Sequence, residues 1–201
     1  MSAPIDFYFD FSSPYGYLAS EKIEALAARH GRGVEWHPIL LGVIFKQTGA
    51  APLTMIPLKG DYSRRDMARS AHFHGIVDFR MPSKFPIPSQ AAARLVLWQK
   101  QQEASSVGRM VHALYRAFFV EDIDISAPDN VIVVAARCGM DSGAARAAIE
   151  DPAIKDALRL ANEEAIARGV CGSPFIVVDG EPFWGMDRLD QVEHWLATGG
   201  W

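Results

Sequence analysis

Residues that favour β-strands gather at the two ends of this 201-residue chain, and this separation constrains the fold more than any other feature. Near the start, Ile and Phe alternate with polar residues over 5–11, and a second strand is predicted over 34–41. Near the end, a β-branched run over 175–178 is followed by Asp179-Gly180, a strong hairpin signal, and a returning strand over 181–184. Because short strands need partners, we expect both ends to meet in one sheet.

The middle of the chain is predicted to be helical. A helix over 14–31 links the first two strands, which favours a parallel pair with a right-handed crossover. Further helices are predicted over 59–73, 90–104, 107–119 and 128–137 (the last capped by Ser126), with two more opened by Asp141 and Asp151 and a closing one capped by Asp187. The order β-α-β, long helical insertion, β-β-α is that of an α/β thioredoxin fold. We expect a thioredoxin-like domain from residues 1–41 and 165–201, and a helical insertion domain over 42–164 that packs on the sheet as a lid.

Composition and motifs exclude several classes of protein. A net charge of −4 disfavours a nucleic-acid or anionic-membrane partner, and no apolar stretch approaches the roughly 20 residues of a membrane span. Residues 1–7 lack the basic region and apolar run of a secretory signal, and the two cysteines have neither metal nor redox spacing. Both observations favour the reducing cytoplasm, and a mature form whose signal was removed is the alternative. His72 and His74 lack a third ligand nearby, so no metal site is expected. Nucleotide-binding glycine motifs and the G-x-S-x-G elbow of hydrolases are absent.

Ser13-Pro14 marks a helix start directly after the first strand. Serine caps a helix well, and proline suits the first helical position because that position needs no amide hydrogen. The free amides and the dipole at such a helix end favour an anion. Ser13 is therefore either a cap alone or a cap beside an anion site.

The stretch from Phe9 to Ala19 resembles the active-site start of the disulfide-oxidoreductase superfamily with a helical insert. Redox members carry Cys-Pro-x-Cys here, whereas this chain has Ser13-Pro14-Tyr15-Gly16 and lacks both thiols that disulfide exchange requires. A serine in the first position is similar to the glutathione-using branch, the kappa-class glutathione transferases and 2-hydroxychromene-2-carboxylate isomerases. The resemblance implies that the Ser13 hydroxyl donates a hydrogen bond to the sulfur of glutathione and stabilises its thiolate.

A second motif, over 169–175, resembles the cis-proline loop of the superfamily. The resemblance implies a cis peptide bond between Ser173 and Pro174, and backbone pairing between this loop and the peptide of glutathione. Without the resemblance, the same residues predict an ordinary turn before a strand. Cys171 lies near this loop but not at the nucleophile position; it is interpreted as a buried, inert thiol, with a reactive thiol as the alternative.

Two further motifs suggest where the ends of glutathione bind. The run over 183–189 is similar to the W-G-N-D-R-L run of the isomerases, with Met186 in place of Asn. The resemblance places Met186 and Asp187 at the glutamyl end, where the carboxylate pairs with the α-amino group. The run over 58–69 resembles K-x-x-Y-x-x-x-D, which implies that Lys59, with Tyr62 beside it, binds the glycyl carboxylate or the substrate carboxylate. The alternatives are a helix cap at Asp187 and a solvated helix face at Lys59 and Tyr62.

The resemblance covers almost the whole chain and implies a glutathione-dependent isomerase that acts on 2-hydroxychromene-2-carboxylate-like aromatic catabolites. It also implies a cytoplasmic homodimer whose partners are glutathione and a small aromatic substrate. One alternative is a kappa-like glutathione transferase or peroxidase. A second is a binding protein of the same fold without turnover, and a third is a disulfide oxidoreductase that uses Cys171.

Overall fold

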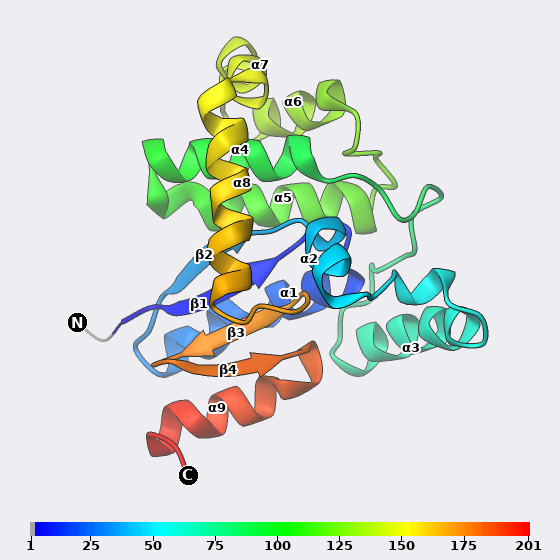
Figure 1. Cartoon of the computed structure of the whole chain (residues 1–201), viewed down its shortest axis with the longest axis vertical. Coiled ribbons are helices and arrows are strands. Elements are labelled where there is room, and N and C mark those ends of the chain that lie inside the picture. The colour runs from blue at the N-terminus through cyan, green and yellow to red at the C-terminus, as the bar shows by residue number, and fades with distance from the viewer. Residues whose placement is uncertain (1–2) are drawn as a thin grey trace.

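The computed structural model describes residues 3–201 and joins the two ends of the chain in one four-stranded sheet (Figure 1). The strand order is β2-β1-β3-β4, with β1 parallel to β2 and antiparallel to β3. The strands are β1 (Ile5–Phe9), β2 (Val34–Pro38), β3 (Phe175–Val178) and β4 (Glu181–Trp184). The predicted α/β thioredoxin fold is therefore confirmed, and the predicted hairpin turn at Asp179-Gly180 joins β3 to β4.

The helices follow the predicted order, with differences at their starts. Asp141 and Asp151 cap their helices as predicted, each accepting a backbone N–H at 2.8 Å. Ser126 does not cap α6, because its hydroxyl donates to Asp124 and Ala127 takes the cap position.

Within residues 3–201, no helix has the length and apolar character needed to cross a membrane. The helices are α1 (Pro14–Arg29), α2 (Leu41–Thr48), α3 (Lys59–Phe73), α4 (Gln90–Gln102), α5 (Val107–Phe119), α6 (Pro128–Arg137), α7 (Ser142–Glu150), α8 (Pro152–Ala167) and α9 (Leu189–Thr198), with short 3-10 turns η1 (Leu53–Met55), η2 (Ala104–Ser106) and η3 (Met186–Arg188).

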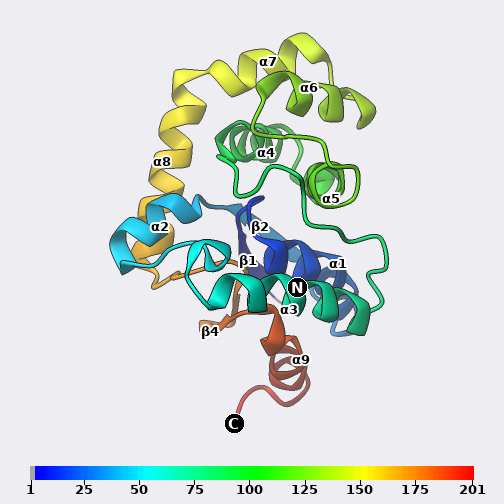
Figure 2. The same ribbon diagram turned by 90° about the vertical axis from the view of Figure 1, so that its right-hand side faces the viewer.

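The sheet has a core on each face because alternate residues of β1 point to opposite sides. Phe7 and Phe9 are fully buried in the larger core, which includes residues of α1 and α5. Tyr8 lies in the smaller core with residues of α2 and α8. Figures 1 and 2 show α4 to α7 gathered at one end of the molecule, with α8 leading back to the sheet and α9 at the other end. The predicted boundary at residue 164 falls inside α8, and both α4 and α8 contact β2.

Candidate active site

Ser13 lies where the end of β1 turns into α1. Its hydroxyl oxygen accepts the N–H of Gly16 at 3.0 Å, so the predicted cap of α1 is confirmed. The same hydroxyl donates its proton to the carbonyl oxygen of Ser173 at 2.8 Å, across 160 positions of sequence. Only 4% of Ser13 is exposed. Its hydroxyl is therefore held both by its own helix and by a loop from the far end of the chain.

The cis-proline loop supplies the second wall of the site. The peptide bond between Ser173 and Pro174 is cis, as the resemblance implied. The Ser173 hydroxyl oxygen accepts the N–H of Asp10 at 3.0 Å, and the Pro174 carbonyl accepts the N–H of Gly185 at 3.0 Å. These bonds bring the motifs around residues 13, 173 and 187 to one end of the sheet.

Asp10 joins more parts of the site than any predicted residue, and sequence reasoning missed it. Its side chain is buried, and its carboxylate accepts hydrogen bonds from the N–H groups of Ser12 and Leu41 and from the Ser89 hydroxyl, at 2.8, 2.6 and 2.7 Å. Burial raises the pKa of Asp10, and these three hydrogen bonds oppose the rise. Its carbonyl oxygen accepts the Tyr115 hydroxyl at 2.9 Å. In the alternating strand pattern Asp10 reads as a solvent-facing position, so only the tertiary contacts identify it.

Lys59 and Tyr62 lie on the first two turns of α3, and both are exposed. One turn further along, Asp66 accepts the Tyr15 hydroxyl at 2.6 Å, which fixes α3 beside the start of α1. Arg69 donates to both Asp66 and Tyr62 and lies over the Tyr62 ring, 5.6 Å from its centroid. Burial and the Asp66 carboxylate raise the pKa of Tyr15. The α3 face that holds Tyr62 is thus tied to a residue two positions from Ser13.

Met186 and Asp187 are neighbours in η3 but differ in their surroundings. Met186 is 4% exposed and packs in the larger core, so any ligand contact at this position must come from its backbone. The Asp187 side chain is 73% exposed. The predicted cap at Asp187 is wrong, because η3 intervenes and Arg188 precedes α9 without a side-chain capping bond. The Asp187 carboxylate is consequently not used by the helix.

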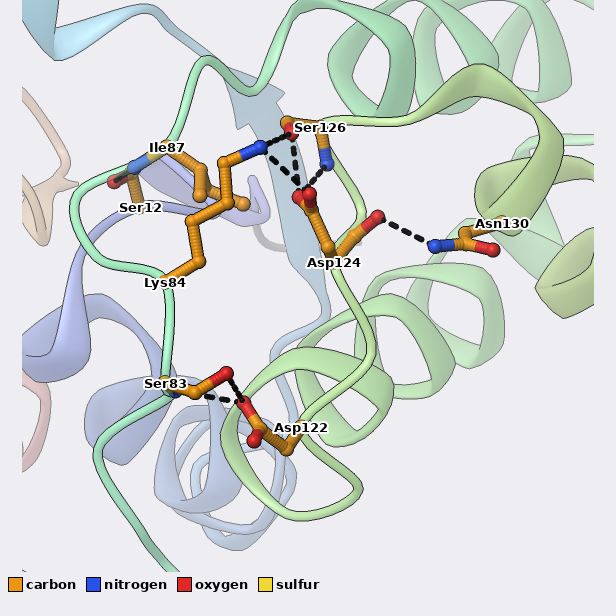
Figure 3. Close-up of polar contacts among 8 residues, drawn as sticks. All are labelled: Ser12, Ser83, Lys84, Ile87, Asp122, Asp124, Ser126 and Asn130. Carbon is orange, nitrogen blue, oxygen red and sulfur yellow. Dashed lines mark hydrogen bonds and ion pairs between the residues drawn. The ribbon is translucent and has the colours of Figure 1, made fainter.

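A proline-rich loop over 75–89 contacts the serine turn and is anchored on its other side by the loop after α5 (Figure 3). The N–H of Ile87 donates to the Ser12 hydroxyl oxygen at 3.1 Å. Lys84 donates to Asp124 at 2.7 Å, and Ser83 donates to Asp122 through its N–H at 2.7 Å and its hydroxyl at 3.1 Å. The loop is therefore fixed at several points between the insertion and the site.

The sequence and the fold are similar to those of known proteins. The family described as the DSBA-like thioredoxin domain matches residues 4–197. The chain belongs to this family. It is 33% identical to a 2-hydroxychromene-2-carboxylate isomerase of Sphingobium xenophagum, over 98% of this chain and 99% of that protein. It is 24% identical to glutathione S-transferase kappa 1 of Homo sapiens, over 96% and 90%. A solved structure of 2-hydroxychromene-2-carboxylate isomerase superposes with a TM-score of 0.87 at 25% identity, covering 96% of this chain and 94% of that one.

The site has no room for a side chain at Gly16, the position to which the resemblance assigns the second thiol of redox members. A Cβ atom built on Gly16 would lie 2.7 Å from the Tyr115 hydroxyl and 2.9 Å from the Ser173 hydroxyl oxygen, far closer than van der Waals contact. Cys138 and Cys171 are both free, and burial raises the pKa of each thiol. A raised pKa keeps a thiol protonated and a poor nucleophile at neutral pH. Cys171 is only half-buried, so its predicted burial is wrong, and its inertness stays a prediction.

Proposed function

We propose that this protein is a glutathione-dependent isomerase of 2-hydroxychromene-2-carboxylate-like aromatic compounds. The observation that carries the proposal is the 2.8 Å hydrogen bond between the Ser13 hydroxyl and the Ser173 carbonyl. It joins a hydroxyl donor at a helix start to the backbone that would pair with the peptide of glutathione. The similarity to named isomerases over almost the whole chain supports the same reaction class.

Glutathione would exchange the bond between Ser13 and Ser173 for two new ones. Its cysteinyl N–H would donate to the Ser173 carbonyl, as an added strand does, and the released Ser13 hydroxyl would donate to the sulfur. The N–H of Gly16 continues to donate to the Ser13 oxygen, so this oxygen keeps its acceptor role and its proton turns to the ligand. The new hydrogen bond and the positive end of the α1 dipole both favour the thiolate over the thiol.

The thiolate then adds to the chromene carbon, and the ring opens. A bond in the opened adduct rotates, and loss of glutathione gives the trans-ortho-hydroxybenzylidenepyruvate, in which the former ring oxygen is the phenolic hydroxyl. Glutathione returns unchanged and no electrons are gained or lost, so the reaction needs no pair of cysteines. This agrees with a site in which Ser13 and Gly16 occupy the two thiol positions of the redox relatives.

The ends of glutathione would be bound by groups of opposite charge. The exposed Asp187 carboxylate would pair with the α-amino group of the glutamyl end, with the backbone of Met186 beside it. Lys59 would pair with the glycyl carboxylate, and Tyr62 is the neighbouring hydroxyl on the same helix. The cytoplasmic homodimer that the resemblance implies stays a prediction.

Calorimetric titration with glutathione tests the proposal, with S-methylglutathione as the control ligand that cannot form a thiolate. We expect glutathione to bind more tightly than S-methylglutathione, and the chromene substrate to isomerise only when glutathione is present. A protein that binds neither ligand contradicts the proposal. Conjugation of an aryl halide without chromene isomerisation would instead support a kappa-like transferase, which the similarity to the human kappa enzyme keeps as the second candidate.

A further inference from the structure

We propose that Trp184 determines the specificity of this site, because its indole forms a platform on which the planar aromatic part of the second substrate stacks. The identity of that substrate rests on the proposed function. The platform itself rests on the geometry of Trp184, Gly172 and the cis-proline loop.

Trp184 exposes much of its indole at the edge of the sheet. It is the last residue of β4, an edge strand, and 60% of it is exposed, whereas Trp36 in β2, the other edge strand, is 4% exposed. Covering an exposed indole with a ligand removes apolar surface from water, which is favourable. The exposed ring is therefore open to a ligand that covers it.

The backbone of Gly172 holds the indole in one place. A Cβ atom at residue 172 would clash with Nε1 of Trp184 and would lie 2.8 Å from its Cε2 and 3.2 Å from its Cδ1, so the pyrrole part of the ring occupies the space of a side chain at residue 172. Any other residue at position 172 would push the ring away. A ring fixed in this way loses little conformational entropy when a ligand stacks on it, which favours binding.

The platform lies next to the atoms proposed to activate glutathione. Gly172 directly precedes Ser173, whose carbonyl holds the Ser13 hydroxyl at 2.8 Å. The residue after Trp184, Gly185, donates its N–H to the Pro174 carbonyl at 3.0 Å, so the end of β4 cannot move independently of the loop. A substrate stacked on Trp184 would therefore be held beside the glutathione sulfur.

The chemistry of the ring selects the occupant. Glutathione has no aromatic group, and the side chains proposed to bind its ends, Lys59 and Asp187, are charged. A flat indole face binds planar aromatic rings best, through offset stacking. The aromatic ring of a chromene-like substrate is such a partner, so we assign the platform to the second substrate and not to glutathione.

Trp184→Leu tests the platform, since leucine still covers Gly172 but lacks a planar face. We expect the KM for 2-hydroxychromene-2-carboxylate to rise about tenfold, the effect of losing one stacking contact. The kcat should stay within about threefold and the glutathione Kd within about twofold, because neither depends on stacking. Trp184→Phe should keep a KM within about threefold of the wild type. Trp201→Leu is the matched control, since Trp201 is also exposed but lies at the C-terminus.

An unchanged KM in Trp184→Leu overturns the proposal. A glutathione Kd that rises as much as the KM also overturns it, because the indole would then belong to the glutathione wall. Gly172→Ala provides a second variant, which displaces the ring without changing it and should raise the KM in the same way.

Equilibrium binding of 2-naphthoate, a planar aromatic carboxylate, separates this proposal from the proposed function. Without glutathione, 2-naphthoate should quench the tryptophan fluorescence of the wild type but not that of Trp184→Leu. Quenching that depends on Trp184 in a protein without isomerase activity would contradict the proposed function and leave the platform standing. Isomerase activity without such quenching would overturn the platform alone.

Discussion

The starts of α1 and α9 carry the same sequence signal but have different structures. Each is predicted to begin with a capping side chain, Ser13 in one and Asp187 in the other. Ser13 does cap its helix, is 4% exposed, and also bonds to Ser173. Asp187 lies in a 3-10 turn before its helix, does not cap it, and has a side chain that is 73% exposed.

The difference shows two ways in which a helix start can serve a ligand. A hydroxyl can accept from its own helix and still donate a proton, so Ser13 keeps a free function while it caps. An ionised carboxylate can only accept, so an aspartate that caps a helix gives its acceptor to that helix. The Asp187 carboxylate is not used by its helix and pairs with Arg188 at 3.4 Å, and it is proposed to bind an ammonium group.

Ser13→Ala should produce the largest effect on activity. Losing the donor to the thiolate should lower kcat by about 100-fold or more. Losing the cap should lower the free energy of unfolding by only about 1 kcal/mol. The control is Asp141→Ala, which removes the cap of α7 and should cost a similar stability without changing turnover. Steady-state rates and urea denaturation measure the two effects, and a Ser13→Ala enzyme with normal turnover would refute the assigned role.

Asp10→Asn tests whether the structure around Ser13 depends on the Asp10 carboxylate. The amide nitrogen would replace an oxygen that accepts a backbone N–H, leaving two donors facing each other. We expect the free energy of unfolding to fall by about 2 kcal/mol, the cost of unsatisfied buried polar groups. Ser89→Ala removes one donor and should cost about 1 kcal/mol. Denaturation that leaves Asp10→Asn as stable as the wild type would show that the carboxylate is dispensable.

Asp187→Asn should have the opposite profile, with an effect on binding and none on folding. Calorimetry should show a glutathione Kd about tenfold higher, because a charge-assisted hydrogen bond is lost. The melting temperature should not change, since the side chain is exposed and caps no helix. Asp190→Asn, another acidic change at the start of α9, should leave the Kd unchanged. Equal Kd values for both variants would remove Asp187 from the site.

The smallest expected effect is a pH dependence of the free energy of unfolding, which arises where α5 contacts α1. His112 of α5 lies 3.0 Å from Glu24 and 3.5 Å from Glu21, both on α1. Burial lowers the pKa of His112, but the two carboxylates outweigh it and the pKa is raised. A raised pKa stabilises the folded state at low pH, and this contribution is lost as the pH rises through it. Stability should therefore fall by up to about 1 kcal/mol between about pH 6 and 8.

His112→Gln should flatten this pH dependence. The ion pair between Arg159 and Glu163 of α8, at 2.7 Å, includes no histidine. Arg159→Gln should therefore lower stability by a similar small amount at both ends of the range. Denaturation at the two pH values measures both variants, and a wild-type stability that rises with pH would contradict the assignment to His112.

Local features of the sequence were enough to predict most of the fold. Strand alternation, the Asp179-Gly180 turn and the Ser13-Pro14 helix start act over a few residues, so they can be read without knowing what lies nearby. The order of these elements then predicts a sheet that joins the two ends, and β1 pairs with β3 accordingly. The division into two domains stays a prediction.

The tertiary structure decided which of these side chains form a site. Donors from three other segments, at Leu41, Ser89 and Tyr115, converge on Asp10, and the Ser13 hydroxyl donates to a carbonyl 160 positions away. Met186 faces inward while Asp187 beside it faces solvent. The sequence motif alone does not show which of the two is buried. Sequence patterns determined the elements because their physics is local, whereas burial and hydrogen-bond partners depend on segments that meet only when the chain has folded.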